Sequence, residues 1–134
     1  MNEAVLDASA VLAFLRNEPG VDRVAQELEN GAYISAVNWA EALSKVFELG
    51  IDCEKLISTL KIQGIIGGAL IVVPVTEDDA LPIGRLRLIT KKDGLSLGDR
   101  ACLALASKMK ARAITADRNW QNIKSATVKI EFIR

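Results

Sequence analysis

Short apolar stretches alternate with longer segments of helical periodicity along this chain. Residues 4–7, 32–35, 69–75 and 111–115 form apolar runs of strand length, and each precedes a segment whose apolar residues recur every three to four positions. This alternation is typical of a parallel sheet that helices cover on both faces. We therefore expect an α/β fold of three layers with a central, mostly parallel sheet. Sites in such sheets lie beyond the carboxyl ends of the strands.

The remaining elements follow from spacing and from residues that break or cap helices. Pro82 is expected to interrupt a helix over residues 76–92 or to delay its start. The run at 69–75 is expected to be a central, buried strand, and residues 128–133 an edge strand. A short helix is expected to open at residues 117–120. The other helices are expected at residues 8–18, 21–30, 36–50, 52–64 and 97–110.

The chain has 134 residues, which fits a single domain over residues 1–134. Its two cysteines, Cys53 and Cys102, lack the spacing of a metal-ligand pair, so we expect buried thiols in a reducing compartment. No signal-peptide pattern begins the sequence, and the longest apolar stretch, residues 65–75, is shorter than the roughly 20 residues that span a bilayer. We expect a soluble cytoplasmic protein with no membrane partner.

The sequence contains no histidine. This absence excludes Ser-His-Asp and Cys-His nucleophilic catalysis, histidine general bases and histidine-ligated zinc. Hydrolytic chemistry in this chain would have to use carboxylates, together with a hard cation.

Charge is divided unevenly between the two parts of the chain. Residues 1–84 carry five Lys/Arg and 13 Asp/Glu, whereas residues 85–134 carry 12 Lys/Arg and four Asp/Glu. The net charges of the two parts are therefore −8 and +8. This asymmetry favours an anionic partner for the surfaces that the last 50 residues form. Alternatively, folding interleaves the two parts and cancels the field.

Four acids fall where the carboxyl edge of the expected sheet would lie. Asp7 closes the first strand, Asp117 follows the strand at 111–115, Asp99 opens the helix before that strand, and Glu41 lies on the helix after the second strand. Clustered carboxylates raise one another's pKa, and a divalent cation relieves that repulsion. Mg²⁺ and Mn²⁺ prefer oxygen ligands, and such ions acidify a bound water and neutralise phosphate charge.

Each acid also has a purely structural explanation. Asp7 and Asp117 can cap the helices that follow them, and Ser96 with Asp99 forms an S-x-x-D capping box. Glu41 lies away from the apolar stripe of its helix, as a solvated glutamate would. The case for chemistry therefore depends on the four acids meeting in one place.

Polar neighbours of these acids are candidates for positioning a substrate or a water. Ser9 and Thr115 lie two residues from Asp7 and Asp117, and both residue types also form turns. Asn38 lies one helical turn before Glu41. Arg100 and Arg118 each follow an acid and are candidates to hold phosphate, although a surface ion pair is the simpler explanation for each.

Four segments of the chain, in order, resemble the PIN-domain family, and within it the VapC-type toxin ribonucleases. The segments are "VLDASAVLAFLRNEPG", "ISAVNWAEALSKV", "LSLGDRACLALA" and "TADRNW", and the resemblance extends over essentially the whole chain. They carry the family's acids at Asp7, Glu41, Asp99 and Asp117, with Thr115 beside the last.

The resemblance implies a PIN-like fold with the four acids in a central groove, binding one or two Mg²⁺ or Mn²⁺ ions. It implies an endoribonuclease that hydrolyses RNA phosphodiester bonds, forms a homodimer and is the toxin of a type II toxin–antitoxin system, with a cognate antitoxin protein that covers the groove. In this hypothesis the acids are both metal ligands and catalytic residues. The residues Ser9, Asn38 and Thr115 orient water or phosphate, and Arg100 and Arg118 contact the RNA backbone.

Two other functions are compatible with parts of the pattern. A phosphotransfer protein also places an aspartate at a strand end, but the dehalogenase type needs a second acid where Ser9 lies, and a receiver needs paired early acids and a late lysine. A non-catalytic PIN-fold module that binds RNA or protein would use the acids only as caps. Apolar stripes at residues 11–15 and 46–49 are candidates for a dimer or antitoxin surface, or for ordinary core.

Overall fold

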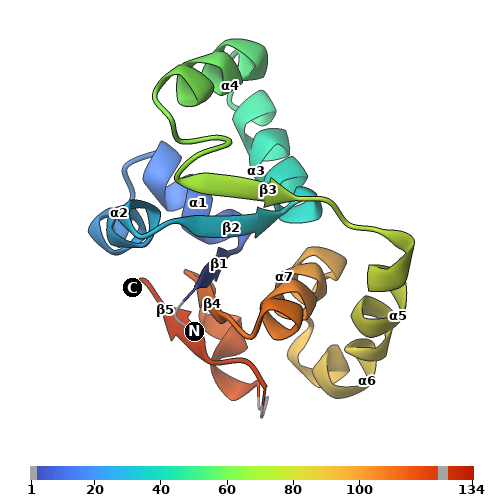
Figure 1. Ribbon diagram of the computed structural model, residues 1–134. Coiled ribbons are helices and arrows are strands. Elements are labelled where there is room, and N and C mark those ends of the chain that lie inside the picture. Colours follow the sequence, from blue (N-terminus) through green and yellow to red (C-terminus); the bar gives the residue numbers. More distant parts are fainter. Residues whose placement is uncertain (1–2, 124–126) are drawn as a thin grey trace.

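The computed structural model describes residues 3–123 and 127–134 and contains a five-stranded, all-parallel sheet (Figure 1). The strand order is β3-β2-β1-β4-β5, so the first strand lies in the middle. In the register, Leu6 pairs with Ile34 on one side and with Ile114 on the other. The strands are β1 (Ala4–Leu6), β2 (Ala32–Ser35), β3 (Leu70–Val73), β4 (Arg112–Thr115) and β5 (Ile130–Phe132).

Helices cover both faces of this sheet. The helical elements are α1 (Ala8–Leu15), α2 (Val21–Glu29), α3 (Ala36–Glu48), α4 (Cys53–Ile62), α5 (Glu77–Arg85), α6 (Arg87–Thr90) and α7 (Leu97–Met109), with short 3₁₀ helices η1 (Lys91–Asp93) and η2 (Arg118–Asn122).

Alternating strand residues divide the core into two apolar clusters. Leu6 and Ile34 belong to a cluster that includes side chains of α1 to α4, whereas Val5 and Ala113 belong to one built with α7 and Trp120. Successive strand residues point to opposite faces of a sheet, which places the clusters on its two sides. The expected three-layer α/β fold is confirmed.

The strand at 69–75 was expected to be central, and this prediction is wrong. β3 lies at the edge of the sheet, paired only with β2 among the described strands, and Ile71 is exposed. The apolar character of a strand reports how well its two faces are covered, and it contains no information about how many strands lie beside it. The edge position of β5 agrees with the expectation for residues 128–133.

Pro82 does not interrupt its helix or delay the start. α5 begins at Glu77, after a capping box formed by Thr76 and Asp79, and runs through Pro82 to Arg85. Proline lacks the N–H that would bond to the carbonyl of the preceding turn, yet the helix continues for three residues beyond it. The chain turns at Leu86, after which α6 begins.

Two further features concern the cysteines and the composition of the helices. Cys53 and Cys102 are both free and buried, as expected. Within residues 3–123 and 127–134, none of the helices combines the length and apolar composition that crossing a membrane requires.

A partly buried ion network joins the end of the chain to α2. The Glu27 carboxylate accepts hydrogen bonds from both Nη atoms of Arg112, at 2.7 and 2.9 Å, and Arg112 also bonds to Glu131 at 3.1 Å. Arg23 bonds to both acids. The hydrogen bond from Arg112 is the largest cause that holds the pKa of Glu27 below its ordinary value. The network ties β4 and β5 to α2.

We expect Arg112→Ala to lower the unfolding free energy by about 3 kcal/mol, because it leaves the buried Glu27 carboxylate without its main partner. Urea unfolding at neutral pH measures this loss. Lys45→Ala is the control, since the Lys45–Glu48 pair is exposed and its removal should change stability by less than about 0.5 kcal/mol. Equal, small effects of the two substitutions would contradict the role of the network.

Candidate active site

Asp7 lies at the carboxyl end of β1 and is almost completely buried. Its Oδ1 accepts hydrogen bonds from the Ser9 hydroxyl at 2.7 Å and from the Ala10 N–H at 2.8 Å, which caps α1. Its Oδ2 accepts a bond from the Thr115 hydroxyl at 2.5 Å. The pairing of β1 with β4 explains this contact, because it brings the ends of both strands together.

The hydroxyl oxygens of Ser9 and Thr115 also accept hydrogen bonds from the turn that follows β4. The Ala116 N–H donates to Ser9 Oγ and the Asp117 N–H donates to Thr115 Oγ1, both at 2.9 Å. Each hydroxyl thus donates to Asp7 and accepts from the turn. The structure therefore shows Ser9 and Thr115 holding Asp7 and the backbone of Asp117.

Asp117 itself caps η2, because its Oδ1 accepts the Asn119 N–H at 2.9 Å. Asp99 completes the capping box of α7, in which the Ser96 N–H donates to Asp99 Oδ2 at 2.9 Å and the Asp99 N–H donates to Ser96 Oγ at 3.1 Å. Three of the four predicted acids are thus helix caps, as their structural explanation expected.

Glu41 reaches the same region from α3. Asn38, which is buried, donates from Nδ2 to Glu41 Oε1 at 3.2 Å and to the Gly98 carbonyl at 2.9 Å. Gly98 precedes Asp99, so this amide joins the second and third acids. Asn38 was identified from its spacing to Glu41, whereas Gly98 was missed; its only sequence signal is a glycine inside the first turn of a helix.

Two of the four acids have raised pKa values. Burial raises the pKa of Asp7 to about 6, against its hydrogen bonds, and the charge of Asp99 adds to the rise. Burial and then Asp99 also raise the pKa of Glu41. Cys102, one turn after Asp99, has a raised pKa through burial and through the charges of Asp7, Asp99 and Glu41. These three acids therefore share one electrostatic environment. Asp117 is not among the causes of these pKa shifts.

The donor set suits a hard divalent cation, although the acids do not form a closed cage. In the part of the chain that the structure describes, no three acidic or thiol side chains lie close enough together to hold a metal ion directly. Mg²⁺ commonly binds through one or two carboxylates and keeps several waters. The burial of Asp7 and Glu41, and the charge of Asp99 beside both, disfavour their ionised forms, and such an ion would offset that cost.

The two predicted arginines point to different neighbours. Arg100 donates from Nη1 to the Ile83 carbonyl of α5 at 3.1 Å, which ties α7 to α5. Arg118 is exposed and lies over the Phe132 ring, 4.6 Å from its centroid. Arg118 therefore lies at the surface against β5, whereas the guanidinium of Arg100 is engaged with helix backbone.

Ion pairs between the two parts of the chain cancel some of the charge asymmetry. Arg112, Lys108 and Arg134 pair with acids of the first 84 residues: Glu27, Asp79 and Glu18, respectively.

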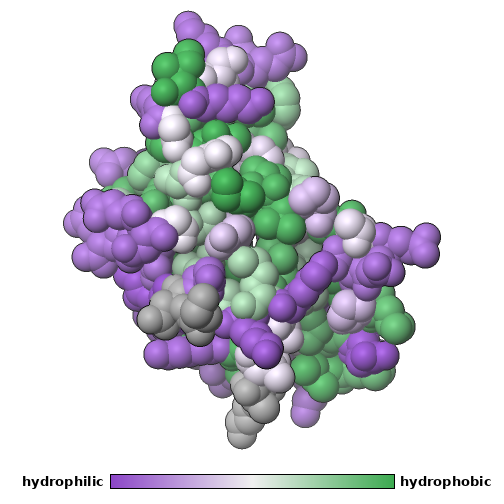
Figure 2. Space-filling model, in the orientation of Figure 1, coloured by the Kyte–Doolittle hydropathy of each residue, from purple (hydrophilic) through white to green (hydrophobic). Residues whose placement is uncertain are grey.

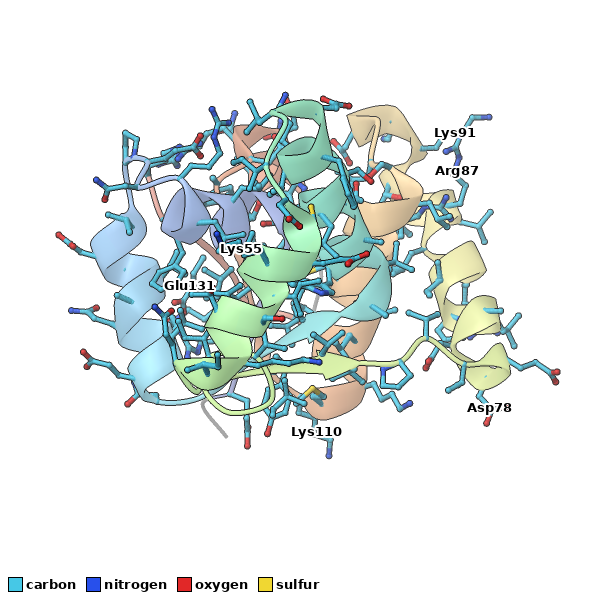
Figure 3. The ribbon with its side chains drawn as sticks, turned by 90° about the horizontal axis from the view of Figure 1, so that it is seen from above. Lys55, Asp78, Arg87, Lys91, Lys110 and Glu131 are labelled. Carbon is cyan, nitrogen blue, oxygen red and sulfur yellow. The ribbon has the colours of Figure 1, made fainter. Side chains whose placement is uncertain are left out.

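The basic residues of α6 and η1 differ, because Arg87, Lys91 and Lys92 are exposed and form no ion pair with any residue in the described ranges. Figure 3 shows Arg87 and Lys91 projecting from the same side. η1 packs against η2 and leads into the start of α7. The basic rim (Arg87, Lys91 and Lys92) therefore lies beside the elements that carry Asp99 and Asp117.

Exposed apolar side chains gather in two places. On α5 and α6 they are Leu81, Leu88 and Ile89, and hydrophobic atoms are visible over these helices in Figure 2. Around the α3–α4 connection and the end of α4 they are Phe47, Leu49, Ile51 and Ile62. The predicted stripe at residues 46–49 is thus partly exposed, whereas the stripe at 11–15 is largely core.

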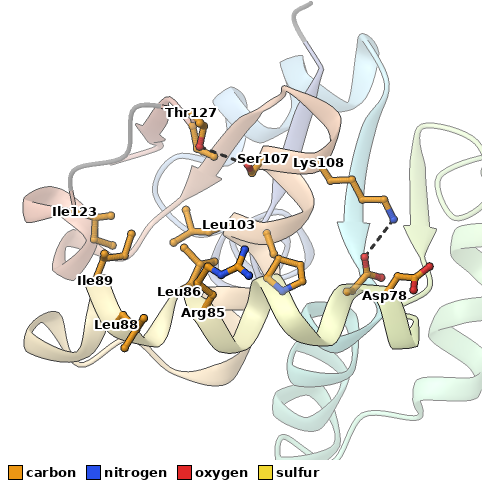
Figure 4. A pocket seen from close by; sticks show the side chains of 14 residues that line it. Asp78, Arg85, Leu86, Leu88, Ile89, Leu103, Ser107, Lys108, Ile123 and Thr127 are labelled. Atoms are coloured by element: carbon orange, nitrogen blue, oxygen red, sulfur yellow. Dashed lines mark hydrogen bonds and ion pairs between the residues drawn. The ribbon is translucent and has the colours of Figure 1, made fainter.

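A cavity of about 570 Å³ lies between α5, α6 and α7 (Figure 4). Its walls include Leu86, Leu103 and Ile123, and the Lys108–Asp79 ion pair lies at one end. None of the four acids lines it, so this cavity is separate from the candidate active site.

These features define an α/β protein with carboxylates gathered at the carboxyl edge of a parallel sheet. A family model described as the PIN domain matches residues 4–126, so the chain belongs to the PIN-domain family. No curated protein matches the chain. The resemblance predicted from the four segments is confirmed at the level of the family.

Solved structures show the same fold. The chain is similar to one in the structure of VapBC2 from Rickettsia felis bound to a promoter DNA fragment, with a TM-score of 0.72, 18% identity and coverage of 97% of this chain and 98% of that one. The chain is also similar to one in the structure of VapBC-1 from nontypeable Haemophilus influenzae, with a TM-score of 0.68, 22% identity and coverage of 98% of each chain. A third similar structure is that of VapBC-5 from Mycobacterium tuberculosis, a member of the VapBC family of toxin–antitoxin systems. Its TM-score is 0.59 at 20% identity, with coverage of 100% of this chain and 99% of that one.

The raised pKa of Asp7 predicts a pH dependence of stability in the absence of divalent cations. The folded state holds this proton up to pH about 6, whereas the unfolded chain releases it near 3.8. Stability should therefore fall as pH rises through this window, by about 3 kcal/mol in total. The test is urea unfolding in EDTA from pH 4 to 7.

Asp7→Asn is the reference variant, because it keeps the shape but cannot titrate. Acids with lowered pKa values, such as Glu27 and Glu131, give an opposite slope in both proteins, so the difference between the two curves isolates Asp7. The wild type should lose more stability than Asp7→Asn between pH 4 and 7. Parallel curves would contradict the assignment.

Proposed function

We propose that this PIN-domain chain is a metal-dependent endoribonuclease and the toxin of a type II toxin–antitoxin system. The observation that carries the proposal is the shared environment of Asp7, Glu41 and Asp99, which lie at the end of β1, on α3 and in the first turn of α7. The charge of Asp99 raises the pKa of Asp7 and of Glu41, and the charges of all three acids raise the pKa of Cys102. Burial of Asp7 and the nearby charge of Asp99 disfavour ionised carboxylates at this edge, although Asp7 and Asp99 also cap helices. This shared environment is the arrangement that a cation-assisted reaction on a phosphodiester needs.

In the proposed site, one or two of the carboxylates of Asp7, Glu41 and Asp99 would bind Mg²⁺ or Mn²⁺ directly and the others would bind its waters, with Asp117 contributing from the neighbouring turn. The cation, when bound, supplies neutralisation of the phosphate charge and acidification of a water. The open arrangement of the acids suits an ion that retains waters as ligands.

The residues around the acids have distinct tasks. Ser9 and Thr115 keep the Asp7 carboxylate in one orientation through their hydroxyl groups. Asn38 orients Glu41, which is exposed and is therefore the acid best placed to accept a proton from an attacking water.

The basic rim supports RNA as the substrate. Arg87, Lys91 and Lys92 are exposed, lie beside the segment that leads to Asp99, and provide positive charge for the phosphate backbone. Arg118 on η2 adds a guanidinium with an aromatic neighbour, Phe132. Such a surface binds single-stranded RNA through charge and stacking.

Partners are proposed from the exposed apolar side chains and from the solved relatives. The relatives in the VapBC structures are toxin–antitoxin proteins, which supports a cognate antitoxin for this chain. The two apolar surfaces, at α5–α6 and at α3–α4, give room for both an antitoxin and a second copy in a homodimer. The cytoplasm, where RNA substrates occur, is the proposed location.

A second function is favoured by one observation. Asp7, Asp99 and Asp117 all cap helices, so each has a structural role that does not need a metal. A PIN-fold module that binds RNA or protein without cutting it would keep these caps. Binding of RNA in EDTA, combined with no cleavage in Mn²⁺, would support this function over the nuclease.

Asp99→Asn should abolish RNA cleavage while leaving the fold intact. An amide oxygen can still accept the Ser96 N–H, so the capping box survives, but the charge that binds the cation is lost. Cleavage of a labelled RNA in Mn²⁺ and thermal unfolding are measured together. The control is Asp52→Asn at the N-cap of α4, which should change neither cleavage nor stability appreciably. Full activity of Asp99→Asn would overturn the proposal.

Reversing charge on the basic rim should weaken RNA binding. The variant with Lys91→Glu and Lys92→Glu removes two phosphate contacts, so its affinity should fall and the slope of log K against log salt should decrease by about 1 to 2. Binding is measured in EDTA by fluorescence anisotropy. The matched control carries Lys55→Glu and Lys61→Glu on α4, where both lysines are also exposed. Equal losses in both variants would contradict a localised RNA surface.

A further inference from the structure

The Glu41 carboxylate lies directly against Gly98, in the first turn of α7. A Cβ atom built on Gly98 would come within 2.8 Å of Glu41 Oε2 and closer still to Oε1 and Cδ. Any side chain at this position would therefore exclude Glu41 from its present place. Two residues thus compete for one space, and glycine leaves that space to the carboxylate.

The backbone does not require glycine here. Gly98 is not among the glycines with positive φ, and it lies inside a regular helix. Glycine in a helix is less favourable than alanine. Neither local conformation nor helix preference explains the residue, so its neighbour Glu41 is the remaining explanation that the contacts provide.

Asn38 holds the carboxylate in the space that Gly98 leaves. Its Nδ2 donates both to Glu41 Oε1 and to the Gly98 carbonyl, so one amide joins the two residues. The orientation of the amide is fixed, because the reverse orientation would place Oδ1 against two acceptors. Among the residues described, none donates a hydrogen bond to Asn38 Oδ1, which is buried.

We propose that Asn38 and Gly98 form a seat that fixes Glu41 beside Asp99, and that Gly98 is a positioning residue of the active site. The inference rests on the proposed function, because the position of Glu41 matters for activity only if Glu41 and Asp99 share a cation. The geometry of the seat itself is independent of any cation. Gly98 acts by having no side chain, so alanine is enough to remove its effect.

Gly98→Ala should displace the exposed and flexible Glu41 side chain without disturbing the core. The expected result is a loss of Mn²⁺ affinity of about tenfold, as is common when a group that orients a metal ligand is changed. Mn²⁺ binding is measured by isothermal titration calorimetry on the full chain, and RNA cleavage is measured in parallel.

Gly84→Ala is the matched control, because Gly84 also lies within a helix, α5, and a Cβ there would meet nothing within 4 Å. This variant should bind Mn²⁺ like the wild type. Glu41→Ala combined with Gly98→Ala should bind Mn²⁺ no more weakly than Glu41→Ala alone, because the seat has no further role once its occupant is gone. A further loss in the double variant, or wild-type affinity in Gly98→Ala, would overturn the inference.

Thermal unfolding in EDTA tests the seat without any metal. Gly98→Ala should raise Tm more in the Glu41→Ala background than in the wild type, since only the wild type loses the seated carboxylate. Gly84→Ala should shift Tm equally in both backgrounds. Equal shifts for Gly98→Ala would overturn the inference, whereas a difference in a protein that binds no Mn²⁺ would support the seat and overturn the proposed nuclease function alone.

Discussion

The structure depends on a single buried carboxylate at the junction of three elements. Asp7 ends the central strand, caps the first helix and receives the hydroxyl group at the end of the neighbouring strand. Its burial raises its pKa, and three hydrogen bonds only partly offset this effect. The carboxyl edge of the sheet is therefore held together by a charged group that the fold itself disfavours. A cation bound at this edge would offset the cost of burying the charged carboxylate.

The acids have structural and proposed chemical roles at the same time, and these roles are linked. A side chain that caps a helix is fixed by backbone N–H groups, so it cannot rotate away when a neighbouring charge repels it. Asp99 shows this well, because the capping box holds it near Glu41 and Asp7. Glu41 caps nothing, and it instead depends on Asn38 and on the space beside Gly98. The site thus combines three rigid acids with one that needs separate support.

Charge and apolar surface are distributed in a way that suits several partners. The network of Glu27, Arg112 and Glu131 neutralises basic charge at the α2 side of the sheet. The basic rim on α6 and η1 keeps its charge, beside the segment that leads to Asp99. Apolar side chains on α5–α6 and α3–α4 remain exposed as well. The cavity under α5 belongs to neither the acids nor the rim.

The sequence by itself determined the class of fold, the helix caps and the identity of the candidate acids. Alternating periodicities specify strands and helices locally, and capping residues such as Ser96 act within a few residues of their partners, so both can be predicted without tertiary contacts. The four segments containing the acids identify the family for the same reason.

Only the tertiary structure decided the order of the strands, the edge position of β3 and the engagement of Arg100 with α5. It also decided that Gly98 and Glu41 meet, because they lie on separate helices. Strand order and contacts between helices depend on how crossover connections pass over the sheet, and no local pattern of residues encodes that path.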